Sequence, residues 1–467
     1  MNKLANLYSS QPLALNTHWL KENLPRYLWD ENEIAGTIAQ VEILYRGESS
    51  QRAVVLYEIE LQHSGPEARR PLYVGYVVPR ERLAAEHENM AAKAKIRPAL
   101  GHTVALVPEA EMIVVAFPND EKLHLLTEAE LHRWAAMHLH EIANGVLEGK
   151  AWEVQEAKTE ILRYVPTKRC TTRCRIKMTT ESAPSLSKEI SFIAKQLAGA
   201  EKARRQYDDL VAMRQAWSGN EKYLPARLPR ALAWEASSAT VFIEEIPGKN
   251  LECVLAEIDL ARVIPAVGGM LADFHRARMR VKRNVTRAGE LADVQNVIQK
   301  IAAAYPNLQP RLQRLFDQLE AVPWDESSTV LLHGTFRLNH IFIHGDDLAL
   351  IDFDSLRMGQ PACDLANFLS SLYYLETQNR LAQPQRHDIV RHFIAGYAAK
   401  ALVPAEVVLW FLADLLIRKQ AYKYLKHFHA EAAQKVEGML ALSEAVFAGC
   451  RKTTADADLT ALWKLLP

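Results

Sequence analysis

The chain has no excess of either charge and no long apolar run. Lys and Arg together number 56, and so do Asp and Glu, so the formal net charge of the 467 residues is zero. This balance argues against a nucleic-acid-binding protein that works through bulk positive charge. No run of about 18 apolar residues occurs, and the start, MNKLANLYSSQPLALNTHW, has no apolar core of signal-peptide length. We therefore expect no nucleic-acid partner, no membrane association and a cytoplasmic location.

Cysteine is scarce, and no C-x-x-C pair occurs. The five residues are scattered and odd in number: Cys170, Cys174, Cys253, Cys363 and Cys450. Such a set predicts neither a disulfide framework nor a zinc site, and favours reduced, buried thiols. The length predicts two or three domains. About half of the residues are apolar (49%) and a quarter charged (24%), as in soluble globular proteins.

The most informative segment is HGTFRLNHIFIHGDDLALIDFDSLRMGQPACDLAN, residues 333–367. A short loop precedes the apolar triplet 341–343, a His-Gly-Asp-Asp turn follows, and a second apolar run, 348–351, ends at Asp352. This pattern predicts a hairpin that brings loop residues beside an acid. Phosphoryl-transfer enzymes need such positioned oxygens around Mg²⁺ more than they need covalent chemistry.

The segment resembles the aminoglycoside phosphotransferase and choline kinase family, which carries H-G-D-x-x-x-x-N, then I-D, then G-x-P-x-x-D-L-A. Residues 359–366, GQPACDLA, fit the last motif fully. The first motif departs from the family, because Thr335 stands where the Asp is expected and His340 where the Asn is expected. The resemblance covers roughly residues 160–450.

The resemblance implies an α+β, two-lobed protein-kinase-like fold preceded by an extra α+β domain. We expect a small β-rich lobe over 160–248 and a large helical lobe over 249–467. The apolar pattern predicts the small-lobe elements in the family's order: strands at 160–165, 170–178 and 190–195, a helix at 199–217 and a strand at 239–246.

The resemblance also implies ATP as the nucleotide, and Lys195 ends the third strand, where a kinase lysine contacts phosphates. Its alternative role is that of a strand-end lysine facing solvent. No G-x-G-x-x-G occurs, and residues 166–169, which include Lys168, take the place of that loop. Lys168, Lys195 and Glu245 are the candidate nucleotide contacts.

Asp352 ends a buried strand, where an acid is costly unless it is paired or metal-bound, and the resemblance implies that it is the ligand of Mg²⁺ or Mn²⁺. Its alternative role is to cap the turn at 353–356. His340 or Asn339 would complete the metal site, although Mg²⁺ prefers oxygen donors. The alternative for His340 is a histidine packed in the loop.

Thr335 decides the mechanism, because its hydroxyl lacks the basicity of the usual Asp. Asp354 or a group on the substrate is then the remaining candidate base. His333 and Asp364 are expected to hold the loop in shape. Arg337 adds a positive charge that suggests an anionic substrate or phosphate.

Residues 1–125 are expected to form the N-terminal α+β domain, followed by a helical linker over 126–159. Strand, helix and proline positions parallel those of the small lobe, with Tyr76 in the place of Lys195. Two interpretations stay open: a duplicated small lobe, or an unrelated α+β domain with the same element order. The segment 127–130, Thr-Glu-Ala-Glu, has capping-box form and predicts a helix start.

These features leave two main functions and a third, weaker one. The first is an ATP- and Mg²⁺-dependent phosphotransferase that acts on a hydroxyl of an unknown small-molecule acceptor. The second is a nucleotide-binding pseudokinase in which residues 1–159 dock a protein partner. The third, a helical interaction protein without a ligand, requires the motifs of 333–366 to be accidental.

Overall fold

The structure is a computed structural model that describes residues 13–30, 38–49, 52–62, 70–98, 100–139, 142, 152–180, 183–218, 227–427, 431–450 and 459–467. It is divided into two compact units, Met1–Tyr207 with Ala231–Glu245, and Asp208–Arg230 with Ile246–Pro467. Residues 1–12 and most of 140–151, which belong to the predicted N-terminal domain and linker, lie outside the described residues. Among the described helices, none is long and apolar enough to span a membrane.

The first sheet of unit 1 is antiparallel and five-stranded, with the order β1-β2-β3-β5-β4. Its strands are β1 (Ile38–Ser49), β2 (Arg52–Leu61), β3 (Leu72–Val77), β4 (Val104–Val107) and β5 (Met112–Ala116). One face packs against α2 (Thr17–Asn23) and α3 (Pro25–Leu28), whose Leu20, Leu24 and Leu28 are fully buried. The other face packs against α4 (Leu83–Lys93) through Leu83 and Met90.

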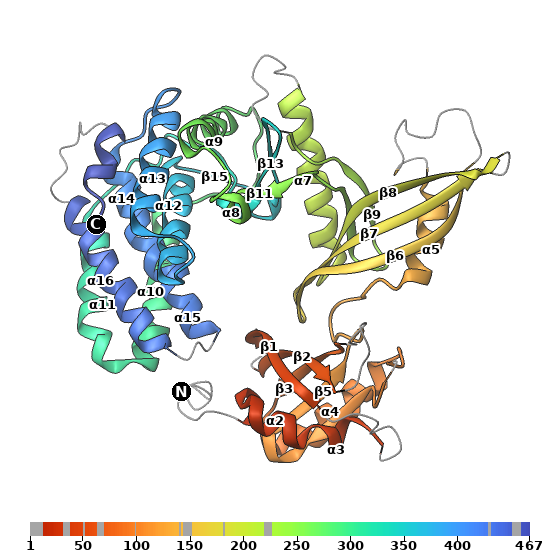
Figure 1. The fold of residues 1–467 in the computed structure, drawn as a ribbon. Helices are drawn as coiled ribbons and strands as arrows, with labels where there is room; N and C mark the ends of the chain where they lie inside the picture. Colours follow the sequence, from red (N-terminus) through yellow and green to blue (C-terminus); the bar gives the residue numbers. More distant parts are fainter. Residues whose placement is uncertain are drawn as a thin grey trace. The chain divides into compact units, whose positions relative to one another are not determined.

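The second sheet has the order β6-β7-β8-β10-β9. Its strands are β6 (Trp152–Val165), β7 (Arg169–Thr180), β8 (Ala183–Leu197), β9 (Ala231–Glu235) and β10 (Thr240–Glu244), and α7 (Ala200–Ser218) follows β8 (Figure 1). Alternate residues of β7 are buried, as a strand with one covered face requires, and Cys170 and Cys174 are among them. The predicted strands and helix are therefore present; the first three strands are longer than predicted, whereas the strand predicted over 239–246 is the shorter β10.

The two sheets share one connectivity, since each has three antiparallel strands, a helix, and two further strands of which the last inserts beside the third. The registers also agree, because Tyr76 of β3 pairs with Ile113 and Lys195 of β8 pairs with Val241. Tyr76 thus holds in the first sheet the place that Lys195 holds in the second. This common order is what a duplicated small lobe would give; the duplication itself stays a prediction.

The predicted helix after the capping box is α5 (Glu128–Met137). Both bonds of the box are present: Glu130 N–H donates to Thr127 Oγ1 at 3.3 Å, and Thr127 N–H donates to Glu130 Oε2 at 2.9 Å. Trp134 of this helix stacks on Phe242 with ring centroids 3.5 Å apart, so α5 covers one face of the second sheet. The predicted helical linker over 126–159 is wrong at its end, because β6 begins at Trp152.

Unit 2 is mainly helical, as predicted, and Trp410, Phe368 and Phe393 lie fully buried in it. Its longer helices are α9 (Leu260–His275), α10 (Arg287–Ala304), α11 (Gln309–Ala321), α12 (Ala362–Thr377), α13 (Gln383–Ala398), α14 (Ala405–Leu415) and α16 (Ala432–Cys450). A π-helical turn, η8 (Leu416–Ala421), joins α14 to α15 (Tyr422–Lys426). Figure 1 draws these helices in green to blue.

Short strands position the predicted site within unit 2. The predicted hairpin is present as β13 (Ile341–His344) and β14 (Asp347–Leu350), in which Ile341 pairs with Leu350. A second pair joins β12 (Val330–Leu332) to β15 (Arg357–Gly359). The loop 333–340 therefore leaves one strand pair and enters the other.

Candidate functional site

Asp364, near the start of α12, holds the loop that follows β12. Its carboxylate accepts hydrogen bonds from the backbone N–H groups of His333, at 2.6 Å, and Gly334, at 2.8 Å. Burial would raise the pKa of Asp364, but the hydrogen bond from His275, together with the charges of His275 and Arg357, holds it below its usual value. The sequence predicts this carboxylate as the acceptor of loop amides, and both bonds are present.

Gly334 and His333 fix the shape of the loop. Gly334 has φ +80°, and a Cβ at this position would lie 2.3 Å from the carbonyl oxygen of Ser355, so no other residue fits without a shift. His333 is fully buried, and its Nε2 lies 2.9 Å from the carbonyl oxygen of Ile351. Burial lowers the pKa of His333, so its ring is neutral and its Nε2–H donates to that oxygen.

Thr335 lies in the middle of the loop and is partly buried. Its Oγ1 is a buried atom without a hydrogen-bond partner in the described part of the chain. A free hydroxyl at this position can contact a ligand, but it cannot accept a proton as a carboxylate does.

Asp352, His340 and Arg337 form one cluster at the end of the hairpin. His340 Nε2 lies 3.1 Å from Asp352 Oδ2, and Arg337 donates to the same nitrogen from Nε, at 3.0 Å, and from a terminal nitrogen, at 2.8 Å. A nitrogen that accepts from a guanidinium cannot also donate to a carboxylate. Arg337 therefore brings a permanent positive charge close to Asp352.

This cluster does not fit a divalent metal ion. Mg²⁺ needs oxygen donors at about 2.1 Å, whereas the imidazole nitrogen beside Asp352 already accepts from a cation. Asn339 Oδ1 is a buried oxygen without a partner among the described residues, so one further donor exists in the loop. No group of three or more His, Cys, Asp or Glu residues in the described part of the chain could hold a metal. This geometry argues against Asp352, His340 and Asn339 as ligands of a divalent ion, and their role in metal binding stays a prediction.

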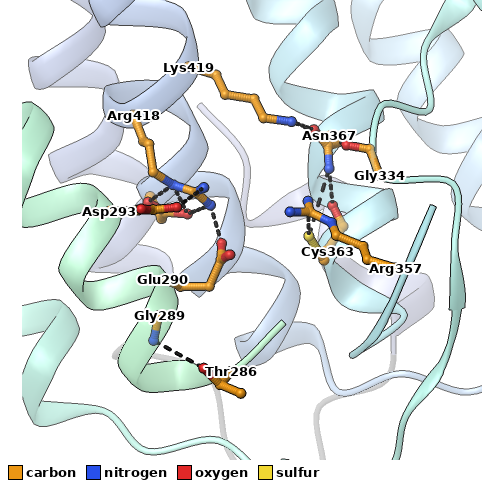
Figure 2. A network of polar contacts seen from close by, with 11 residues as sticks. Thr286, Gly289, Glu290, Asp293, Gly334, Arg357, Cys363, Asn367, Arg418 and Lys419 are labelled. Carbon is orange, nitrogen blue, oxygen red and sulfur yellow. Dashed lines mark hydrogen bonds and ion pairs between the residues drawn. The ribbon is translucent and has the colours of Figure 1, made fainter. Parts of the chain in front are cut away.

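A lysine that the sequence analysis missed contacts the same loop. Lys419 of the turn η8 donates to Asn367 Oδ1 at 2.5 Å and to the carbonyl oxygen of Gly334 at 3.3 Å (Figure 2). Arg357 of β15 lies nearby and donates to Cys363 Sγ at 3.4 Å. In the sequence, the adjacent Arg418 and Lys419 within an apolar helical stretch were the feature that could have indicated this contact.

In unit 1, α5 covers the face of β8 that carries Phe192 and Ala194, and Lys195 lies on the opposite face of this strand. Two other predicted nucleotide contacts are engaged within this unit. Lys168 donates to the hydroxyl of Tyr45 at 3.2 Å. Glu245 accepts from Arg173 Nε at 2.7 Å, which makes it part of an ion pair rather than a free acceptor.

Asp354, the candidate base, is partly buried in unit 2, and its backbone carbonyl accepts from Arg283 at 3.1 Å.

Comparison with known proteins gives a family match over residues 187–401, to the model described as "Phosphotransferase enzyme family". The matched segment contains Lys195, His333, Asp352 and Asp364. No curated protein matches. Similar solved structures include a macrolide 2'-phosphotransferase from Brachybacterium faecium, 14% identical, covering 66% of this chain and 97% of that chain with a TM-score of 0.40.

Two further structures are similar. A spectinomycin phosphotransferase in complex with ADP and spectinomycin is 12% identical, covers 73% of this chain and 100% of that chain, and has a TM-score of 0.45. A choline/ethanolamine kinase family protein from Mesorhizobium loti is 14% identical and covers 70% and 98%, with a TM-score of 0.40. Residues 187–401 thus match the model of the phosphotransferase enzyme family, in agreement with the resemblance of the motifs at 333–366.

Proposed function

We propose that this phosphotransferase-like chain binds a nucleoside triphosphate but transfers its phosphoryl group poorly or not at all. The family match, with Lys195 at the end of the third small-lobe strand, supports nucleotide binding. The order of the loop, in which Asp364 holds two backbone amides, supports a preserved binding scaffold.

One observation carries the loss of transfer: Arg337 donates two hydrogen bonds to His340 Nε2, the atom next to Asp352. The guanidinium keeps its charge at all ordinary pH values. It compensates the carboxylate that would otherwise attract Mg²⁺. Nucleotide binding at this site would therefore not require a divalent ion.

The replacement of the usual Asp by Thr335 would also reduce phosphoryl transfer. General-base help contributes about 10²- to 10⁴-fold to such reactions, and the hydroxyl of Thr335 cannot supply it. The resemblance implies that Thr335 would face the acceptor hydroxyl and His340 the metal, so the loop differs from the family at both positions.

The second candidate is an active phosphotransferase that uses ATP to phosphorylate a hydroxyl of a small molecule. It is favoured by the bonds from Asp364 to the loop, because positioning alone can accelerate a reaction. Asp354 or a group on the acceptor would then take the proton.

Isothermal titration with ATP, in Mg²⁺ and then in EDTA, tests the proposal. We expect the two affinities to agree within about threefold, and we expect Lys195→Ala to weaken binding. Lys188→Ala is the matched control, because this lysine lies on the same strand and contacts the ring of Trp152. Absence of ATP binding at millimolar nucleotide would refute the proposal.

Turnover separates the two candidates. We expect no ATP turnover by the wild-type chain, and a gain when Thr335→Asp, His340→Asn and Arg337→His are combined, because these changes restore the base and remove the cation. Wild-type turnover that Asp352→Ala abolishes would instead establish the active phosphotransferase.

A further inference from the structure

Two cationic side chains of unit 2 converge beside the loop 333–335. Lys419 reaches the carbonyl oxygen of Gly334 from the π-helical turn η8, and Arg357 approaches Cys363 from β15. Asn367 connects the two, because its Oδ1 accepts from Lys419 and its Nδ2 donates to the carbonyl oxygen of Cys363 at 2.9 Å (Figure 2). Isolated π-helical turns are frequent at functional sites.

Neither cation has a carboxylate partner among the described residues. Lys419 donates only to neutral oxygens, and Arg357 donates to a thiol sulfur. The Nε of Arg357 is a buried atom without a hydrogen-bond partner in the described residues. A partly buried cation is costly when no anion compensates it.

The neighbouring Arg418 shows the contrast. It is paired with Asp414, at 2.6 Å, with Glu290, and with Asp293, at 3.6 Å. In Figure 2, Glu290 and Asp293 lie next to Arg418, away from the Lys419 ammonium. These acids therefore bond to Arg418, and no carboxylate among the described residues bonds to Lys419 or Arg357, although the charges of Cys363, Glu290 and Asp364 raise the pKa of Arg357 against the effect of burial.

The electrostatics of Lys419 agree with a missing anion. Burial, together with the charges of Arg357 and Arg418, lowers the pKa of Lys419 to about 8. If the side chain served only to connect Gly334 to Asn367, a neutral amide would make the same bonds without the cost of a buried charge.

We propose that Lys419 and Arg357 bind an anionic group, a phosphate or a carboxylate, of a small ligand that lies beside Gly334 and Thr335. Arginine binds such groups through two parallel N–H donors, and lysine acts as a point charge. The proposal goes beyond nucleotide binding and does not depend on phosphoryl transfer. It predicts that the ligand next to this loop is acidic rather than a cationic amine.

The test is a calorimetric titration of the full-length chain with inorganic phosphate, in the absence of nucleotide. We expect millimolar binding by the wild-type chain and at least about tenfold weaker binding by Lys419→Gln and by Arg357→Gln. Lys423→Gln is the matched control, because Lys423 follows in α15 and donates to Gln420 at 2.8 Å. This variant should bind phosphate as the wild type does.

Circular dichroism and thermal unfolding of each variant show whether it is folded. If Arg357→Gln fails to fold, Lys419→Gln still decides the question, because its side chain can keep the bond to Asn367. Wild type without phosphate binding at about 10 mM, or Lys419→Gln with wild-type affinity, would overturn the proposal.

Competition identifies the source of the anion. Phosphate binding that persists in saturating ATP would support a separate anionic ligand. Displacement of phosphate by ATP but not by ADP would overturn the proposal, because the site would then bind the terminal phosphate of the nucleotide. The outcome is independent of the proposed nucleotide site, because Lys195→Ala should impair ATP binding and leave phosphate binding unchanged.

Discussion

Asp120, just after the first sheet, accepts a hydrogen bond at 2.8 Å from the backbone N–H of Thr167, in the turn between β6 and β7. The same carboxylate oxygen accepts from the hydroxyl of Tyr164 at 2.6 Å. Thr167 has φ +62°, so the turn is held in a conformation that threonine rarely adopts. The resemblance predicts this turn in the place of the glycine-rich loop of kinases, and in the structure one of its amides is bonded to a carboxylate.

Asp120→Asn should release this turn. Its Oδ1 can keep the bonds from Lys122 N–H, at 2.7 Å, and Leu123 N–H, at 2.9 Å, while the bonds from Thr167 and Tyr164 lose their acceptor. We expect the amide of Thr167 to exchange hydrogen faster, and the chain to lose about 1–3 kcal/mol of stability. Hydrogen exchange read by mass spectrometry measures the first effect. Unchanged exchange at this turn would show that Asp120 does not restrain it.

Asp364→Asn should weaken the loop 333–334 and change its acid stability. The folded-state pKa of Asp364 lies below its value in the unfolded chain. The carboxylate therefore stabilises the fold at neutral pH, and this stabilisation is lost as the pH falls below about 4. We expect a loss of about 2–3 kcal/mol at pH 7 that shrinks on acidification. Urea unfolding of both chains across this range measures it, and a difference that stays constant with pH would contradict the assignment.

Lys419→Gln should alter the alkaline stability of unit 2. The pKa of Lys419 is about 8 in the folded chain and about 10.4 when unfolded. Between these values the unfolded state binds more protons, so this residue makes stability rise with pH. The buried thiol of Cys363, whose pKa burial raises to about 11, opposes the trend. The comparison of wild type with Lys419→Gln at each pH isolates the lysine: the variant should be more stable below pH 8, and the difference should vanish towards pH 10. A constant difference would refute the lowered pKa.

Arg52→Met should destabilise the first sheet. The side chain is 4% exposed and pairs with Glu86, at 3.0 Å, and Glu121, at 2.6 Å. Loss of a buried partner leaves charges uncompensated and costs about 3–5 kcal/mol. Arg70→Met is the control, because Arg70 pairs with two acids of the same sheet but is 49% exposed, and such pairs contribute at most about 1 kcal/mol. Equal effects of the two substitutions, measured by denaturant unfolding, would contradict the buried network.

The sequence predicted the parts of this chain that local pattern determines. The hairpin at 341–350, the strand that carries Lys195, the capping box at Thr127 and the loop bonds of Asp364 all follow from residues close together or from one family motif. Alternation of apolar residues gave the strands, but the start of β6 was placed too late because residues 152–160 alternate weakly and are largely exposed.

Contacts between distant residues could not be predicted. The bond between Asp120 and Thr167 joins two sheets, and the bond between Lys419 and Gly334 joins helix and loop across 85 positions. The spacing of Arg337 and His340 was visible, but the contact of His340 with Asp352 depends on the backbone path of the hairpin. The metal ligands were therefore predicted from the family resemblance, without the contact between Arg337 and His340 that the structure shows.

The π-helical turn η8 gives two adjacent residues separate surroundings, acids for Arg418 and loop oxygens for Lys419. A π-helical turn holds one residue more than an α-helical turn. Removing that residue would rotate the following side chains by about 100° about the helix axis, and the ammonium would leave the loop while both helices kept their ends. If Lys419 binds the proposed anion, a single-codon deletion in η8 would thus remove that contact without any substitution in the motifs at 333–366.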